Sequence, residues 1–335
     1  MKAKILQVLR QNRQGYVSGQ ELCRQLGVSR TAIWKYIKQL KDAGYMIEGV
    51  QNKGYCLIAA PDILSESEIV SQLHTKWLGN SVKYFEELDS TNTEAKRIAE
   101  TSDWTQWHGM VVVTDKQTAG RGRRGRDWDS PQGSGLFFSI LLKPEIAPSN
   151  AAMVTLVKAM AAVKGIAEVT GLQPQIKWPN DIVLNGKKIV GILTEMSAQV
   201  DYVNHIVVGT GINVHQTEFP DEIAQTATSL DLEVGKEGRN LQIFRAELLA
   251  AVLKYFENYY EIYLQSQDLS ALMEEYNHLL ANRGRGVRVL DPLGEYQGVA
   301  LGIDKRGELL VEREYEIVKV SSGEVSVRGI YGYID

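Results

Sequence analysis

A short segment rich in arginine and glycine is the part of this chain that most clearly indicates chemistry. It reads GRGRRGR from Gly120 to Arg126 and follows the apolar strand MVVVT expected at residues 110–114. Four clustered arginines repel one another and the glycines resist order, so the segment is costly to order without a counter-anion. A phosphate supplies such an anion, because guanidinium groups bind it through paired hydrogen bonds. The pattern indicates an anion-binding loop, although a solvated basic loop or a nucleic-acid patch is equally typical of a short Arg/Gly run.

Three other segments could add polar groups to the same site. Residues 89–92 (DSTN) precede an expected helix, and such a polar start either caps the helix or binds a small ligand. Residues 177–181 (KWPND) end one strand, and after a hairpin turn at Asn185-Gly186 the strand KKIVGI follows at 187–192. Residues 209–213 (GTGIN) close another strand with two glycines, where a ligand can lie against bare backbone. These neighbours favour a ligand-binding role for the arginine loop.

Charge separates the start of the chain from the rest. Residues 1–60 hold ten Lys and Arg against three acids, whereas the whole chain of 335 residues has a net charge of −4. A basic head on an acidic body suggests that only the head meets a polyanion. Apolar residues make up 44% of the chain and charged residues 23%, as in globular proteins. With two cysteines, no secretion signal and no apolar run of about 20 residues, we expect a cytoplasmic protein without a membrane partner.

The basic head has the periodicity of a small DNA-binding module. We expect helices at 2–12, 19–26 and 30–42, followed by strands at 45–48 and 55–58. Ser29 caps the third helix, whose opening turns are polar and basic. The segment resembles a winged helix-turn-helix over nearly all of residues 1–60, although a domain for dimerisation or protein contact would show the same helices. The expected DNA-binding residues are Ser29, Arg30, Thr31, Trp34, Lys35 and, in the wing, Lys53.

The rest of the chain divides into two further parts, which gives an α+β multidomain protein. The head ends near Pro61, so that we expect domains at 1–61, 62–282 and 283–335. The middle part mixes apolar strands with two amphipathic helical stretches. The last part contains five short alternating strands, which predict a small β-barrel or sandwich.

Taken together and in this order, the motifs make the sequence resemble the biotin–protein ligase family. GRGRRGR with Trp128 just after it, KWPND and GTGIN carry the resemblance, which runs from Ser90 to Asn213. It implies a central mixed α/β domain of the biotin/lipoate ligase type and a C-terminal SH3-like β-barrel. It also implies that biotin and ATP, with Mg²⁺, form biotinoyl-5′-AMP, and that biotin then passes to a lysine of a biotin carboxyl carrier protein. As an adenylate-bound homodimer, with biotinoyl-5′-AMP as corepressor, such a protein binds operator DNA through residues 1–60 and represses genes of biotin synthesis and transport.

The resemblance assigns roles to individual residues. Lys188 and Arg123 are the expected catalytic residues, and the position of Lys188 relative to KWPND favours it over Lys187. The expected biotin-binding residues are Ser90, Thr91, Asn92, Gln117, Gly120, Arg121, Gly122, Arg123, Lys188, Gly191, Gly209 and Gly211. The expected nucleotide-binding residues are Arg121, Arg124, Arg126, Trp128, Asn180, Asp181 and Asn213. Trp128 would cover the adenine and Asp181 would help to place Mg²⁺, while no carboxylate cluster predicts a protein metal site.

Three other interpretations stay open at this stage. The chain could be a transcription regulator that senses a small anion without catalysis, although Lys188 argues against this. It could be a ligase whose head no longer represses transcription. It could also be a lipoate ligase, whose fold is related, although the complete GRGRRGR favours biotin.

Overall fold

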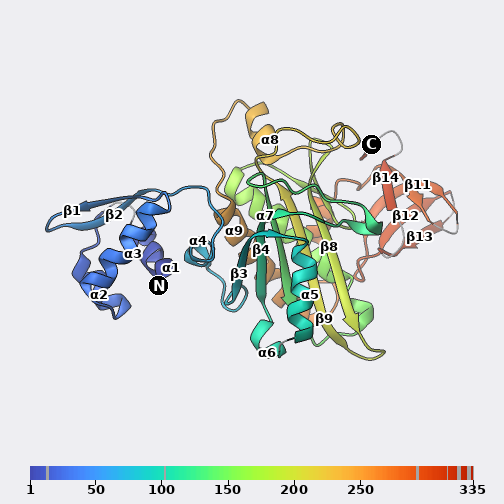
Figure 1. Cartoon of the computed structure of the whole chain (residues 1–335). Coiled ribbons are helices and arrows are strands. Elements are labelled where there is room, and N and C mark those ends of the chain that lie inside the picture. The colour runs from blue at the N-terminus through green and yellow to red at the C-terminus, as the bar shows by residue number, and fades with distance from the viewer. Residues whose placement is uncertain are drawn as a thin grey trace.

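The computed structural model describes residues 1–12, 15–101, 103–291, 294–314, 316–322, 326–329 and 333–334. A small N-terminal head and a small C-terminal sheet lie on opposite sides of a larger central body (Figure 1). In the part of the chain that the structure describes, no helix combines the length and apolar character needed to cross a bilayer.

The head consists of three helices and a hairpin, as predicted. In chain order its elements are α1 (Lys2–Gln11), α2 (Gly19–Leu26), α3 (Arg30–Asp42), β1 (Met46–Val50) and β2 (Gly54–Ala59). The Ser29 hydroxyl accepts a hydrogen bond from the backbone N–H of Ala32, which caps α3. Ile33, Ile37 and Leu40 are buried on one side of this helix, so its polar face points outward.

A seven-stranded mixed sheet forms the middle of the body. Its strands are β3 (Val82–Leu88), β4 (Met110–Gln117), β5 (Gly135–Leu142), β9 (Val203–Asn213), β8 (Lys187–Ala198), β7 (Asp181–Leu184) and β6 (Gln175–Lys177), in that spatial order. β3 and β4 run parallel because the helix α5 (Thr91–Thr101) connects them, and the remaining neighbours run antiparallel.

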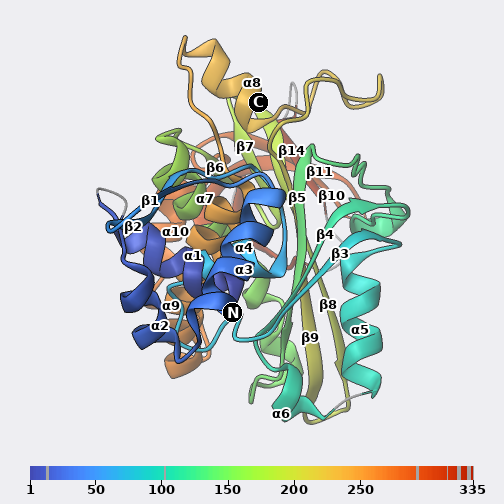
Figure 2. The ribbon, with the colours of Figure 1, turned by 60° about the vertical axis from the view of Figure 1, so that its left-hand side comes forward.

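Helices cover both faces of this sheet. The other helices of the body are α4 (Glu66–Gln72), α6 (Trp104–Trp107), α7 (Met153–Thr170), α8 (Leu230–Lys236), α9 (Arg245–Ser266) and α10 (Met273–Leu279). α7 and α9 pack on one face, and α5 lies on the other (Figure 2). Val112 and Leu141 point toward α5, whereas Val111 and Ile140 join the core with α7 and α9. Strand β5 is therefore buried along its whole length.

The C-terminal part forms a five-stranded antiparallel sheet, which confirms the predicted strands. Its elements are β13 (Glu316–Val320), β12 (Leu309–Arg313), β11 (Tyr296–Ile303), β10 (Gly286–Leu290) and β14 (Ser326–Gly329), in spatial order. β13 and β14 are the two edges, so the described strands form an open sheet, and they do not show whether the sheet closes into the SH3-like barrel that the resemblance implies. The indole N–H of Trp178 donates to the Gly307 carbonyl at 3.0 Å and ties this sheet to the body.

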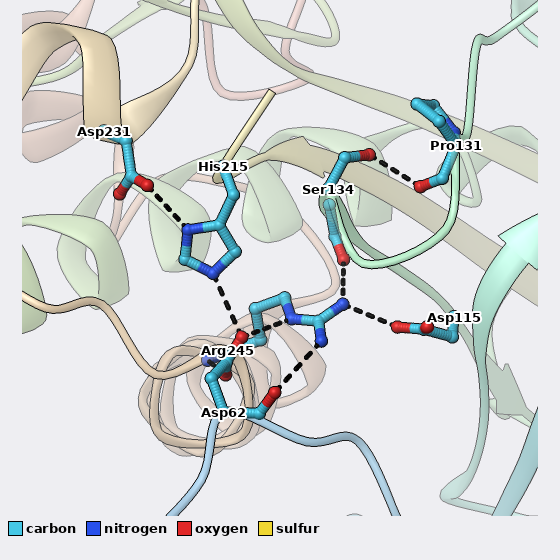
Figure 3. Close-up of polar contacts among 8 residues, drawn as sticks. Asp62, Asp115, Pro131, Ser134, His215, Asp231 and Arg245 are labelled. Carbon is cyan, nitrogen blue, oxygen red and sulfur yellow. Dashed lines mark hydrogen bonds and ion pairs between the residues drawn. The ribbon is translucent and has the colours of Figure 1, made fainter. Parts of the chain in front are cut away.

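Buried ion pairs fix the junction between head and body. Asp62, just after the head, binds the guanidinium of Arg245 at 2.8 Å, and Arg245 also binds Asp115 at 2.6 Å (Figure 3). His215 lies between Asp62, at 3.0 Å, and Asp231, at 2.8 Å. Burial alone would lower the pKa of His215, but its hydrogen bonds to the two carboxylates outweigh burial and raise it.

Arg245→Leu should destabilise the body by about 3–5 kcal/mol, because it removes the buried cation that pairs with both Asp62 and Asp115 and leaves Asp115 without it. Urea unfolding followed by circular dichroism would measure the change. Lys254→Met is the matched control, since it breaks an exposed ion pair with Glu168 that contributes at most about 1 kcal/mol. Equal effects of the two substitutions would contradict the prediction.

Candidate functional site

The four segments singled out in the sequence meet at two adjoining cavities beside the central sheet. The inner cavity is lined by Ser90, Thr91, Asn92, Gln117, Arg121, Gly122, Arg123, Trp128, Asn180, Lys188, Gly191, Ile192, Leu193, Gly209, Thr210 and Gly211. All the expected biotin-binding residues except Gly120 are in this set. Gly120 lies next to it, where its carbonyl accepts a hydrogen bond from the backbone N–H of Trp128.

The outer cavity collects the residues expected to bind a nucleotide. It is lined by Gly122, Arg123, Arg124, Arg126, Asp127, Trp128, Asp129, Lys177, Asn180, Asp181, Lys188, Asn213, Gln216, Phe219, Glu222, Ile223, Thr226, Ala227, Arg328 and Tyr333. Arg121 is the one expected nucleotide residue that lines only the inner cavity. Both cavities share Gly122, Arg123, Trp128, Asn180 and Lys188, so these residues lie where the two cavities adjoin.

Hydrogen bonds hold the polar end of the inner cavity in place. Gln117 accepts a hydrogen bond from the backbone N–H of Thr91 at 3.0 Å, at the first residue of α5. The Ser139 hydroxyl lies 2.6 Å from the side-chain oxygen of Asn92, whose amide nitrogen donates to Glu195 at 2.7 Å. Ser139 and Glu195 were not predicted. A single serine inside the apolar strand GLFFSILL was the available signal for Ser139.

One buried carboxylate organises the cations of the outer cavity. Lys188 lies 2.6 Å from Asp181, and Lys177 lies 3.9 Å from the other oxygen of the same carboxylate. Burial lowers the pKa of Lys177 to about 8. Burial would raise the pKa of Asp181, but the charges of Lys188 and Lys177 outweigh it and keep the pKa below its usual value. Tyr333, from the C-terminal tail, donates its hydroxyl hydrogen to Asp181.

The arginine loop folds back on itself beside these residues. The backbone N–H of Gly122 donates to the Arg126 carbonyl at 2.7 Å. Arg123 is half-buried, and its guanidinium donates to the side chain of Asn180 at 3.1 Å and to the Ser322 carbonyl at 2.7 Å. Burial lowers the pKa of Arg123. Arg121, Arg124 and Arg126 are exposed, so their guanidinium groups are accessible to an anion from solvent.

Two of the glycines predicted to offer bare backbone are covered by side chains of the chain itself. The indole of Trp128 lies against Gly191 and Gly211, where a Cβ atom would overlap the ring. The amide of Asn92 lies in the same way against Gly209. Because Gly191 and Gly211 have no side chains, the indole of Trp128 can lie directly on strands β8 and β9, between the two cavities.

The residues expected to bind DNA form an exposed set on the head. Ser29, Arg30, Thr31, Trp34 and Lys35 lie at the start of α3, and Lys53 lies in the turn between β1 and β2. Trp34 is 58% exposed, so it does not belong to the core of the head.

A head of three helices and a hairpin, joined to a body with two adjoining cavities that cations line, is the arrangement expected of a nucleotide-dependent ligase with its own DNA-binding domain. Family models support each part of this description. Residues 84–213 match the Biotin/lipoate A/B protein ligase family, residues 2–56 match an HTH domain, and residues 284–328 match the Biotin protein ligase C terminal domain.

Similar proteins identify the family. The chain is 40% identical to the "Bifunctional ligase/repressor BirA" of Bacillus subtilis over 98% of both chains. It is 31% identical to the protein of the same name from Escherichia coli, over 93% of this chain and 92% of that one. The structure of "Biotin protein ligase from Aquifex aeolicus in complex with biotin and ATP" covers 75% of this chain, with 30% identity, a TM-score of 0.63 and 99% of its own length matched. The chain belongs to the biotin–protein ligases, in the group of bifunctional ligase/repressors.

Gly211→Ala should displace Trp128, because the new Cβ atom would overlap the indole ring. We expect an affinity for biotin at least about tenfold lower, which is about 1.4 kcal/mol, measured by isothermal titration calorimetry. Gly235→Ala is the matched control, since Gly235 lies in α8 and a Cβ atom there meets nothing within 4 Å. An unchanged affinity in Gly211→Ala would show that the position of Trp128 does not matter for the inner cavity.

Proposed function

We propose that the inner cavity binds biotin and the outer cavity binds ATP with Mg²⁺. The observation that carries this assignment is the set of five residues that line both cavities. Ligands that fill the two cavities would bring a carboxylate and a phosphate together beside Arg123 and Lys188. Ser90, Thr91, Asn92 and Gln117 would hold the polar ring of biotin at the far end, where hydrogen bonds already fix their positions.

In the first step, a carboxylate oxygen of biotin attacks the α-phosphorus of ATP, and pyrophosphate leaves with the bonding electron pair. The step brings two anions together, so its barrier includes their repulsion. Lys188 and Arg123 would offset this repulsion and stabilise the charge that develops on the phosphate. Trp128 would cover the adenine, while Asn180 and Asp181 would lie beside the phosphates and Mg²⁺.

In the second step, the amine of a lysine on the biotin carboxyl carrier protein attacks the carbonyl carbon of biotinoyl-5′-AMP. AMP leaves and an amide bond forms, with the proton of the amine lost to solvent. Neither step needs a nucleophile from the ligase itself. The arginine loop would instead retain the adenylate until the carrier arrives, because its exposed guanidinium groups match the phosphate.

We also propose that biotinoyl-5′-AMP acts as corepressor. The adenylate would neutralise the arginine loop, and the ordered surface would favour a homodimer that places two heads on a palindromic operator. The start of α3 would enter the major groove, and the β1–β2 hairpin would act as a wing whose Lys53 contacts the phosphate backbone. In this proposal residues 1–61 are a winged helix-turn-helix DNA-binding domain, residues 62–282 the catalytic domain and residues 283–335 an SH3-like domain. The protein would act in the cytoplasm.

Lys188→Ala should slow biotin transfer by at least about 100-fold, because it removes the cation nearest the point where the two reacting anions meet. The measurement is the mass of a biotin carboxyl carrier domain incubated with the enzyme, biotin, ATP and Mg²⁺. Lys187→Ala is the matched control and should transfer biotin at a rate within about twofold of wild type. Equal rates in both variants would contradict the assignment of Lys188, and inhibition by excess lipoate would favour the related lipoate ligases.

Lys35→Ala should weaken operator binding about tenfold and lower the salt dependence by about one counterion. The operator can be selected from a randomised DNA pool in the presence of biotin and ATP, and affinity measured by fluorescence anisotropy. Lys41→Ala removes the same charge from the far end of α3 and should have little effect. Biotin with ATP should strengthen binding by the wild-type chain, and no enhancement would indicate a ligase whose head does not repress.

A further inference from the structure

We propose that Tyr333, in the C-terminal tail, is a positioning residue for the adenylation step. It would act through Asp181 to keep Lys188 directed toward the point where the two cavities adjoin. The inference rests on the function proposed above for this site. It concerns a residue outside the motifs through which the sequence resembles its family.

The contacts of Tyr333 join three parts of the chain. Its hydroxyl donates to one oxygen of Asp181, and the other oxygen of the same carboxylate lies 2.6 Å from Lys188. The ammonium of Lys177 lies 3.7 Å from the centre of the Tyr333 ring. The next residue, Ile334, is buried against Val183 and Ala281 of the body. Tyr333 and Ile334 are therefore anchored, and the Tyr333 hydroxyl has a fixed place within the site.

The arrangement divides the two oxygens of Asp181 between different partners. A carboxylate with a side chain only 13% exposed must be paired and hydrogen-bonded to remain charged. Tyr333 and Lys177 satisfy one oxygen, so Lys188 need approach only the other. When substrate anions draw Lys188 toward them, Asp181 keeps two partners and stays in place.

Removal of the hydroxyl would change this balance. One oxygen of Asp181 would then face Lys177 alone, at 3.9 Å, which is beyond hydrogen-bonding distance. The under-satisfied carboxylate would hold Lys188 more tightly and oppose its movement toward the substrates. The ring of a phenylalanine would still pack on Lys177, so the substitution isolates the hydroxyl.

The test uses the full chain and the release of pyrophosphate from ATP in the presence of biotin, before any carrier is added. Tyr333→Phe should lower the maximal rate of pyrophosphate release in this single turnover about tenfold, and it should leave the biotin concentration that gives half of that rate within about twofold of wild type. Tyr296→Phe is the matched control, since it makes the same change in β11, where the ring packs against Arg313 rather than the site.

The outcomes separate this inference from the proposed function. A wild-type chain that releases no pyrophosphate with biotin would refute the function itself. With an active wild type, an unchanged single-turnover rate in Tyr333→Phe would overturn the role of Tyr333. A lower rate together with a lower melting temperature and a raised half-saturating biotin concentration would also overturn it, because that combination indicates a purely structural role.

Discussion

The site depends on one constraint: several cations must stay close together in a partly buried place before any substrate anion arrives. Burial lowers the pKa of Lys177 to about 8 and also lowers that of Arg123, which shows how strongly the surroundings disfavour positive charge. Asp181 stabilises two of these cations, because its carboxylate pairs with Lys188 and Lys177. In the function proposed above, a substrate phosphate would bind to cations that are already paired, so no bare cation would have to be desolvated before it arrives.

The C-terminal region also supplies hydrogen-bond partners to the charged groups of the site, so it forms part of the site. Arg123 donates to the carbonyl of Ser322, and Tyr333 donates to Asp181. The hydrogen bond from Trp178 to Gly307 holds the same sheet against the body. These three contacts join different points of the C-terminal region to the body. Together they fix the position of that region relative to the two cavities.

The head is attached by the same kind of interaction. Arg10 of α1 forms an ion pair with Glu68 of α4, and Tyr45 donates to the same carboxylate. Arg245 and His215 hold Asp62 a few residues earlier, at the end of the linker. Two separate buried carboxylates therefore anchor the head and its linker. These ion pairs would restrict the orientation of the head relative to the body more than a flexible linker alone would. The position of the DNA-binding surface would then depend on the position of the body.

The sequence predicted those features that depend on local pattern, and it missed those that depend on contacts between distant residues. The capped helix α3 and the cluster of Ser90, Lys188 and Gly211 follow from residue types at short spacing and from motif resemblance. Alternation predicted the five C-terminal strands, but it does not determine whether the edge strands pair, and the described strands form an open sheet. Tyr333 lies more than 150 positions from its partner Asp181, and no periodicity connects residues that far apart. A buried charge requires a partner, and the fold can supply that partner from any part of the chain. Residues such as Tyr333 are therefore identified from the contacts of the buried charge in the structure, and not from its neighbours in the sequence.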